Sequence, residues 1–551
     1  MDGDRTIVRR PTTRSLGGLA LLAVPILFLG YFFLYPLLTI SRRGLTVDGS
    51  FDLSVFADVL TDPSLQGVFA FTLWQAIAST ILTVAFGLPA AWVFARFTFR
   101  GKRILGALTL VPFVLPTLVV ATAFLNLVGP RGVTGVDLTG TLAIILMAHV
   151  FYNFSVVVRG VGSYWSRIDP RLEDAARTLG ASSWSAFRTI TLPLLRPAIA
   201  ASSALVFLFS FTSFGVVLVL GDLSRTTIEV EIWRQATAFL RLDVASTLAI
   251  LQILAIGAIL VAYSAIERRT TTSFTQEMGG GRPPRTRGER IAVGSILTVT
   301  LAFLGVPLGM LVARSLQAPG GGLGWANYTN LADLPASSAG FVSPTEAITN
   351  SLVFAAAATM IAMGIGVLAA GAMTFTRPTV GRTLDLFVML PLGTSAVTIG
   401  FGFLLALGQP IDIRGSALLI PIAHALVGIP FVVRTVNPAL GSIGISIREA
   451  AATLGAGPFR TFWSVDLRIV RSALLVGAAF AYAISMGEFG ATSFIARPST
   501  PTIPVAIFRY LGRPGDAPFG AALAMSVILM VVTAGAIVAI EAFGSARRRR
   551  S

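Results

Sequence analysis

The chain has 551 residues, of which 54% are hydrophobic and only 12% are charged. Soluble proteins carry roughly a quarter charged residues, so this composition excludes a soluble enzyme and indicates an all-α polytopic membrane protein. The formal net charge is +16, and all but one of the 42 basic residues are arginines. No cysteine is present, which excludes disulfides and thiolate metal sites. The arginines collect between apolar stretches, so we expect them to orient the chain in a membrane rather than to bind nucleic acid.

Twelve apolar stretches are long enough to cross a bilayer, which takes about 20 helical residues. Prolines inside them, such as Pro89 and Pro116, are expected to be tolerated because neighbouring helices can satisfy the freed backbone groups. The first stretch follows a basic N-terminus like a signal peptide but lacks a small-residue cleavage site, which predicts an uncleaved span. The spans are expected near residues 19–40, 68–95, 105–128, 141–162, 198–220, 247–266, 291–313, 347–374, 384–407, 416–433, 473–489 and 519–543.

Basic residues between the spans predict the orientation of the chain. They lie on the side of the basic N-terminus, at 96–103, 268–290 and 547–550, whereas opposite loops are acidic or balanced. Because positive loops stay in the cytoplasm, both termini are predicted to be cytoplasmic.

Residues 270–290 are rich in Thr, Gly, Pro and Arg, which predicts a flexible cytoplasmic linker. The linker separates a first half, residues 1–269 with six spans, from a second half, residues 291–551 with six more.

The two halves are repeats of each other. The segment EDAARTLGA at 173–181 recurs as REAAATLGA at 448–456, an offset of 275 residues (448 − 173). Further upstream the offset is 279, as in Gly87 and Gly366 (366 − 87). Six spans separate the copies, so the repeats are parallel and related by an axis along the membrane normal.

The repeated segment lies in the loop between the fourth and fifth spans of each half. Its small residues and glycine predict an Ala-rich helix, a turn and a second helix, able to dock closely into another protein; an ordinary cytoplasmic loop is the alternative. In the first half, Pro193 is expected to stiffen the return segment, whereas Arg468 leaves the second return helix free to continue. The candidate residues are Asp174, Ala175, Ala176 and Gly180 in the first loop, and Glu449, Ala450, Ala451 and Gly455 in the second.

These loops resemble the EAA loop of ABC importer permeases, the binding-protein-dependent inner-membrane components with the MetI-like permease fold. The resemblance implies about 12 transmembrane helices in two tandem six-helix halves in a bacterial inner membrane. It also implies that each loop seats a coupling helix in one of two copies of a P-loop ATPase, and that a periplasmic or lipid-anchored binding protein delivers substrate. Asp174 replaces the usual Glu, and Val465 and Arg468 replace the usual Ile and Pro, so unequal coupling by the two loops is expected.

The chain itself is not expected to hydrolyse ATP. A P-loop requires G-x-x-x-x-G-K-[ST], and the only lysine, Lys102, lies in RFTFRGKRI, which does not fit. No catalytic residue and no cofactor is therefore predicted. A 12-span secondary transporter is the rival interpretation, but ARFTFRGKRIL after the second span lacks the Asp of the loop typical of that class.

Among fused permeases, the chain is most similar to the thiamine type, with the ferric-iron type as the alternative. The similarity lies in HVFYNFSVVVR at 149–159, TTIEVEIWRQA at 226–236 and SMGEFGATSFI at 485–495.

Two kinds of polar residue in the apolar spans are candidates for the translocation path or for packing. Glu488, with Ser213 at the equivalent position, is a candidate path residue because a membrane carboxylate suits a cation such as thiamine; the alternative is an acid paired with Arg497 or Arg509. The equivalent histidines, His149 and His424, are interpreted as helix-packing hydrogen bonders rather than metal ligands, and no metal site is predicted.

Overall fold

The computed structural model describes residues 16–47, 50–267, 281–317, 322–332, 343–409 and 412–548. The chain forms two compact units. The α8 unit comprises residues 44–333 and 507–530, and the α20 unit comprises residues 1–43, 334–506 and 531–551.

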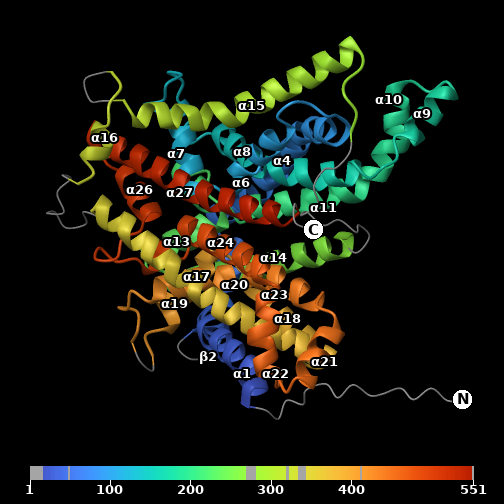
Figure 1. Ribbon diagram of the computed structural model, residues 1–551. Helices are drawn as coiled ribbons and strands as arrows, with labels where there is room; N and C mark the ends of the chain where they lie inside the picture. The colour runs from blue at the N-terminus through green and yellow to red at the C-terminus, as the bar shows by residue number, and fades with distance from the viewer. Residues whose placement is uncertain are drawn as a thin grey trace, which may run out of the picture. The chain divides into compact units, whose positions relative to one another are not determined.

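Apart from one two-stranded hairpin, the described part of the α8 unit consists of helices (Figure 1). Its elements are β1 (Thr46–Val47), β2 (Ser50–Phe51), α3 (Ser54–Thr61), α4 (Pro63–Arg96), α5 (Lys102–Leu108), α6 (Val111–Val114), α7 (Thr117–Val128), α8 (Leu142–Trp165), α9 (Arg171–Thr178), α10 (Ser183–Ala186), the π-helix η2 (Phe187–Thr191), α11 (Leu192–Phe211), α12 (Gly215–Leu220), α13 (Ile228–Thr237), α14 (Leu242–Glu267), α15 (Arg287–Ser315) and α16 (Ala326–Thr329).

The α20 unit repeats much of this order of helices. Its elements are α1 (Leu16–Leu29), the π-helix η1 (Gly30–Leu34), α17 (Pro344–Phe375), α18 (Pro378–Met389), the 3₁₀ helix η3 (Leu390–Gly393), α19 (Ala396–Ala406), α20 (Leu419–Gly441), α21 (Ile445–Thr453), α22 (Pro458–Thr461), the π-helix η4 (Phe462–Asp466), α23 (Leu467–Ile469), α24 (Arg471–Gly487) and α25 (Thr492–Ile495). Three helices contribute residues to both units: α2 (Tyr35–Leu45), α26 (Ile503–Leu511) and α27 (Asp516–Arg548).

Each unit is built around three mutually packed helices, α4, α8 and α11 in one and α17, α20 and α24 in the other. A glycine at equivalent positions permits a close approach in both. A Cβ built on Gly87 would lie 2.8 Å from Val157, and one built on Gly366 would lie 2.7 Å from Val432. Any larger residue would force these helices apart, so the repeated glycines permit the same kind of close helix contact in both units.

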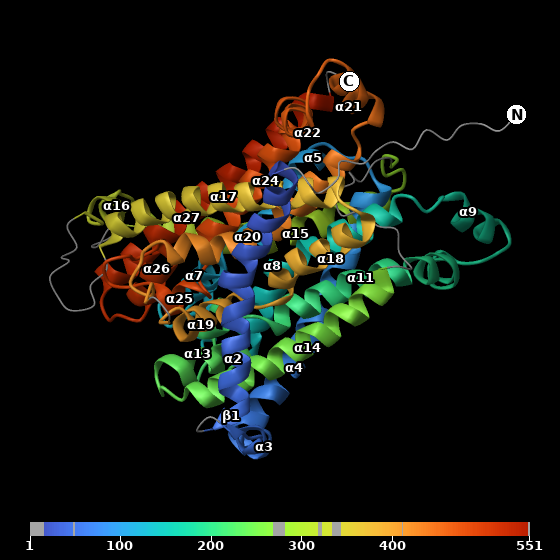
Figure 2. The ribbon, with the colours of Figure 1, turned by 90° about the horizontal axis from the view of Figure 1, so that it is seen from below.

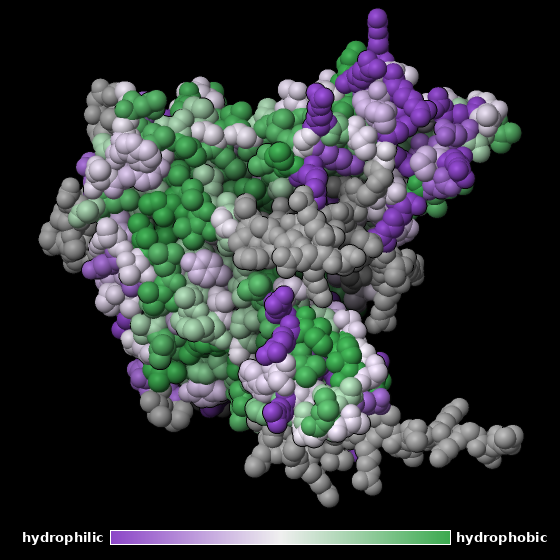
Figure 3. All heavy atoms as spheres, in the orientation of Figure 1, coloured by the Kyte–Doolittle hydropathy of each residue, from purple (hydrophilic) through white to green (hydrophobic). Residues whose placement is uncertain are grey.

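Nine helices within the described residues are long and apolar enough to cross a membrane, and three bent pairs raise the number to 12 if each is one span. Their outer faces carry exposed apolar residues, including Leu27, Val261 and Met360. Hydrophobic side chains cover much of the surface in Figure 3, while hydrophilic ones gather around α9 and α10. Such faces suit contact with lipid, and the all-α polytopic prediction is confirmed.

The third span of the first half, predicted as one helix over 105–128, is broken. The axis turns by 99° between Val114 and Thr117. Leu115 is extended at the break, because a residue before proline is pushed out of the helical region. Pro116 therefore lies at a break between two helices, whereas Pro89 is accommodated inside α4.

The equivalent span, predicted over 384–407, breaks at the same place by other means. The axis turns by 96° between α18–η3 and α19. Ser395, aligned with Pro116, is extended, and its hydroxyl accepts a hydrogen bond from the Thr398 N–H at 3.1 Å. A serine N-cap in one half thus does what proline does in the other. Neither shows in a hydropathy plot.

The fifth span of the first half also differs from its prediction. The stretch 198–220 is divided, since α11 ends at Phe211 and α12 begins at Gly215. Upstream, however, α10, η2 and α11 form one continuous span that includes Pro193.

In the second half, the helix bends by 77° at Val470 although Arg468 stands where proline is expected. The expectation that this return helix would continue is therefore wrong. Both return segments contain a short π-helix, η2 at Phe187–Thr191 and η4 at Phe462–Asp466. A π-helix shifts the local backbone hydrogen bonds by one residue. Because η2 ends two residues before Pro193, this shift relieves the clash that proline causes in a regular helix.

The compact units and the sequence repeat divide the chain at different positions. The first span, α1, packs on α17, and the seventh, α15, packs on α4 and α7. The division at 1–269, 270–290 and 291–551 describes the repeat and stays a prediction, and residues 270–280 of the linker lie outside the described part.

Candidate functional site

The first repeated loop consists of two short helices joined by a glycine turn. Asp174, Ala175 and Ala176 lie on α9, and none of the described residues 171–178 is buried. Gly180 forms the turn with φ of +92°, a conformation that residues with a Cβ rarely adopt. In Figure 2, α9 lies out beyond the end of α11. The order of helix, turn and helix is the predicted one.

The second loop has the same construction. Glu449, Ala450 and Ala451 lie on α21, none of whose described residues is buried. Gly455 forms the turn with φ of +80°. Each loop therefore presents a short helix with no buried residue among those described, so apolar packing contributes little to holding it in place.

Three apolar side chains are exposed at equivalent positions of both loops. Sequence reasoning missed them because it compared only the small residues of the motif. An exposed apolar cluster that recurs in this way suits a protein partner. The equivalent pairs, each 275 residues apart, are Leu172 and Ile447, Leu179 and Leu454, and Trp184 and Phe459.

An ion pair attaches the first loop to the helix that precedes it, and a hydrogen bond attaches it to the helix that follows. Glu173 Oε1 on α9 lies 2.9 Å from Arg96 Nη2 at the end of α4, and it accepts a hydrogen bond from the Thr191 hydroxyl at 2.5 Å. Arg96 Nη1 also donates to the Ile168 carbonyl at 2.9 Å. We call Arg96, Glu173 and Thr191 the first anchor.

The equivalent positions of the second half carry different residues with the charges reversed. Arg448 (448 − 173 = 275) donates from Nε to Asp466 Oδ1 at 3.0 Å, and Asp466 (466 − 191 = 275) is fully buried. The Arg448 guanidinium also lies 4.9 Å from the ring centroid of Phe375 (375 − 96 = 279). We call Phe375, Arg448 and Asp466 the second anchor.

The end of the linker lies on the same side of the α8 unit as the first loop. The Thr98 N–H donates to the Arg282 carbonyl at 3.0 Å, and Arg282 pairs with Glu289. This hydrogen bond to Glu289, with a smaller contribution from Asp174 on α9, raises the pKa of Arg282. The segments predicted to be cytoplasmic, which are the end of α4, the loop with α9 and the segment before α15, thus meet on one side.

Both buried histidines are hydrogen-bonded through both ring nitrogens. His149 contacts the hydroxyls of Ser79 at 3.0 Å and Ser213 at 2.8 Å. His424 contacts Ser485 and Thr492, each at 2.7 Å. The contacts join α8 to α4 and to the segment between α11 and α12, and they join α20 to α24 and α25, as expected of packing residues. The described ranges hold no group of three or more His, Asp or Glu side chains placed to bind a metal.

The structure places Glu488 at the end of α24, where its Oε1 accepts a hydrogen bond from the Ala491 N–H at 2.8 Å. Among the described residues, no ion pair joins Glu488 to Arg497 or Arg509. Ser213, the equivalent residue, contacts His149 instead. The two positions have thus diverged, one to a carboxylate and the other to a packing hydroxyl.

Two buried carboxylates on α13 were not selected from the sequence. Glu229 accepts a hydrogen bond from the Gln252 amide, and Glu231 accepts one from Gln235 at 2.7 Å. Both acids are almost fully buried, although they lie in an amphipathic segment that reads as a surface helix. Comparison of the halves could have singled out these acids, because the equivalent residues of the second half are the uncharged Pro504 and Ala506.

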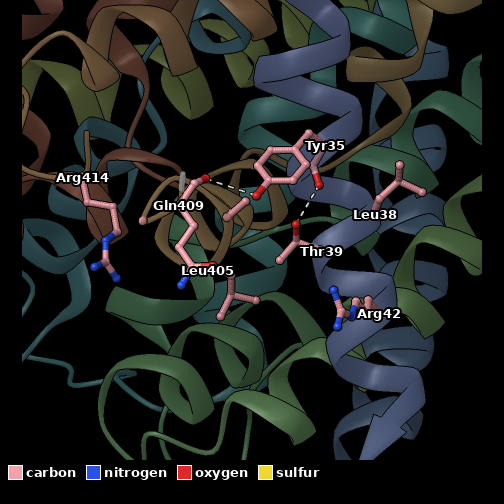
Figure 4. Close-up of a pocket in the computed structure, with 9 residues that line it drawn as sticks. Tyr35, Leu38, Thr39, Arg42, Leu405, Gln409 and Arg414 are labelled. Carbon is pink, nitrogen blue, oxygen red and sulfur yellow. Dashed lines mark hydrogen bonds between the residues drawn. The ribbon is translucent and has the colours of Figure 1, made fainter. Parts of the chain in front are cut away.

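A cavity of about 430 Å³ lies in the α20 unit between α2 and the segment after α19. Its wall includes Tyr35, whose hydroxyl donates to the Gln409 carbonyl at 3.2 Å, together with Arg42 and Arg414 (Figure 4). Arg414 forms two hydrogen bonds of 2.9 Å with Asp412 and lowers the pKa of that carboxyl to about 2. Both groups of this pair are therefore charged at neutral pH.

The repeated architecture has known relatives. Residues 85–271 and 362–549 each match the family described as binding-protein-dependent transport system inner membrane component. The chain is 28% identical over 556 residues to the thiamine transport system permease protein ThiP of Brucella suis, covering 96% of both chains. It is 26% identical to ThiP of Escherichia coli, covering 86% of this chain and 88% of the relative.

A solved structure of a bacterial ABC transporter involved in alginate import is also similar, with a TM-score of 0.39 and 18% identity over 46% of this chain and 96% of that one. The two family matches confirm the resemblance drawn from the loops and exclude the secondary-transporter alternative. The chain belongs to the binding-protein-dependent transport system inner membrane components, as a multi-pass permease in which two copies of the family domain are fused.

Proposed function

We propose that this permease forms the translocation path of an ATP-driven ABC importer that takes up thiamine. The observation that carries the importer assignment is the pair of projecting loops with the same exposed apolar residues, Leu179 and Leu454 among them. Thiamine is supported by relatives that bear that name and align with 96% of the chain, and these favour it over ferric iron.

The two loops each dock one ATPase subunit, so the complete importer holds two. The chain has no P-loop of its own, so the energy must come from separate subunits. In this proposal, Asp174, Ala175, Ala176 and Gly180 form one docking element, and the other consists of Glu449, Ala450, Ala451 and Gly455. A periplasmic or lipid-anchored binding protein delivers substrate to the opposite side.

Both termini are cytoplasmic in this proposal. The basic segments at the end of α4 and before α15 meet the first loop on one side of the α8 unit, as the positive-inside rule requires of cytoplasmic loops.

Glu488 contributes negative charge to the path of a cationic substrate. A carboxylate beside an apolar span costs free energy unless it has a function or a partner. The Glu488 carboxylate accepts a hydrogen bond from a backbone N–H, and no arginine pairs with it among the described residues. Ser213 is the neutral equivalent in the other half.

Reconstitution tests the proposal. The permease, its ATPase and its binding protein are placed in proteoliposomes, and uptake of radiolabelled thiamine is measured with ATP inside. ATP-dependent uptake that excess unlabelled thiamine, but not ferric iron, suppresses supports the proposal. Uptake without ATPase, or a binding protein that does not bind thiamine, contradicts it.

A further inference from the structure

We infer that the two anchors transmit motion of the first and second loops to the spanning helices. The two anchors occupy equivalent positions, but their charged residues are exchanged between the halves. The inference rests on the proposed function, because it concerns how docking of the ATPase is transmitted.

The anchors are the main attachment of the loops. No described residue of α9 or α21 is buried, so apolar packing does not fix these helices. Glu173 connects α9 with the last residue of α4, Arg96, and with the last residue of η2, Thr191. A displacement of α9 is therefore passed directly to one spanning helix before the loop and to another after it.

Arg448 makes the same three-way connection in the second half. It joins α21 to the last residue of α17, Phe375, by a cation–π contact and to the last residue of η4, Asp466, by an ion pair. It also donates to the Leu440 carbonyl on α20 at 3.0 Å. The positions are the same as in the first anchor, whereas the chemistry has been exchanged.

This exchange makes each anchor an indivisible set of three residues. Arginine at position 173 would face Arg96, and glutamate at position 448 would face the buried Asp466. Like charges so close repel, and a buried carboxylate without its partner is strongly unfavourable. Only a change of all three residues together would recreate an anchor.

The test transposes the anchors. E173R and R448E are compared with the triple variants R96F/E173R/T191D and F375R/R448E/D466T, which convert each anchor into the type found in the other half. We expect each single reversal to reduce ATP-driven uptake about tenfold. We expect each triple variant to recover uptake to within about twofold of the parent. Arg103 and Arg382, equivalent exposed arginines outside the anchors, supply the controls R103E and R382E.

Amide hydrogen exchange of α9 and α21 in the permease alone provides a second measurement that needs no ATPase. Faster exchange in the single variants, reversed in the triple variants, supports the inference whether or not an ATPase binds the parent chain. Failure of any ATPase to bind the parent chain contradicts the proposed function instead. Where a reversal prevents folding, E173Q and R448Q replace it. Triple variants that stay as defective as the singles, or singles that behave like the controls, overturn the inference.

Discussion

Leu179 and Leu454 stand at equivalent positions beside the glycine turns of the two loops and are 90% and 89% exposed. Each is the residue immediately before the glycine, so the turn presents it outward. Full exposure of a large apolar side chain is unfavourable in water, and its repetition in both halves indicates a surface that a partner covers.

Leu454→Asp should therefore weaken ATPase binding without affecting folding. A side chain of leucine size contributes about 2 kcal/mol when buried, so we expect the affinity to fall roughly thirtyfold. Co-purification of the ATPase measures this, with Leu223→Asp, an exposed leucine outside the loops, as the control. Equal ATPase recovery with L454D, L179D and L223D would show that the loops do not dock the partner.

The glycines themselves should be sensitive for a conformational reason. No described atom lies within 4 Å of a Cβ built on Gly180 or Gly455, so a larger residue meets strain only through its positive φ. That strain costs about 1–2 kcal/mol, and more for a β-branched residue. Gly455→Val should insert normally but lower ATPase recovery and uptake, and more so than Gly180→Val because Glu449 keeps the usual motif.

Gly135→Val, with φ of +70° and open surroundings in a different loop, is the matched control for these variants. A Gly180→Val/Gly455→Val double variant with full ATPase association and full uptake would reduce both loops to simple connectors.

The sequence predicted the helical class, the repeat and the loops because each leaves a local signal. Apolar stretches of about 20 residues mark spans, and identical residues at a constant offset, such as Gly87 and Gly366, mark equivalent positions. The helix breaks at Pro116 and Ser395 were not predicted, since a hydropathy average contains no backbone angles.

The anchors were missed for a different reason. Comparison of the halves selected residues that are the same, whereas Glu173 and Arg448 are equivalent and opposite in charge. Opposite charges at one offset, accompanied by a second change at Thr191 and Asp466, were a usable signal. Which residues meet across the fold, as Arg96 meets Glu173 over 77 positions, still depends on tertiary packing.

The histidines should stabilise the fold without any metal. Replacing His424 with alanine removes the hydrogen-bond partner of Ser485 and Thr492, and each bond of this kind in a membrane is worth about 0.6 kcal/mol or more. We expect His424→Ala and His149→Ala each to lower the melting temperature in detergent, and EDTA to leave the parent unchanged. Metal bound stoichiometrically to the parent and lost from these variants would contradict the packing role.

Orientation can be measured on this cysteine-free chain by single cysteines. Ser183→Cys lies at the start of α10 in the loop predicted to be cytoplasmic, and Val136→Cys lies in an exposed loop predicted to face outward. A membrane-impermeant maleimide should label position 136 in intact cells and position 183 only after permeabilisation. The reverse pattern would invert the topology. Position 280 of the linker lies outside the described residues.

Glu488→Gln should distinguish a role of the Glu488 negative charge in transport from a structural role of its side chain. The glutamine amide oxygen can accept the Ala491 N–H hydrogen bond that Glu488 Oε1 accepts at 2.8 Å, so the backbone after α24 should keep its conformation while the negative charge is lost. If this charge assists a cation through the path, thiamine uptake should fall roughly tenfold, corresponding to about 1.4 kcal/mol, while basal ATPase activity and assembly persist. Asp412→Asn is the control, because it removes an exposed carboxylate whose partner is Arg414. Uptake kinetics unchanged in the Glu488→Gln variant would assign this carboxylate a structural role at the end of α24.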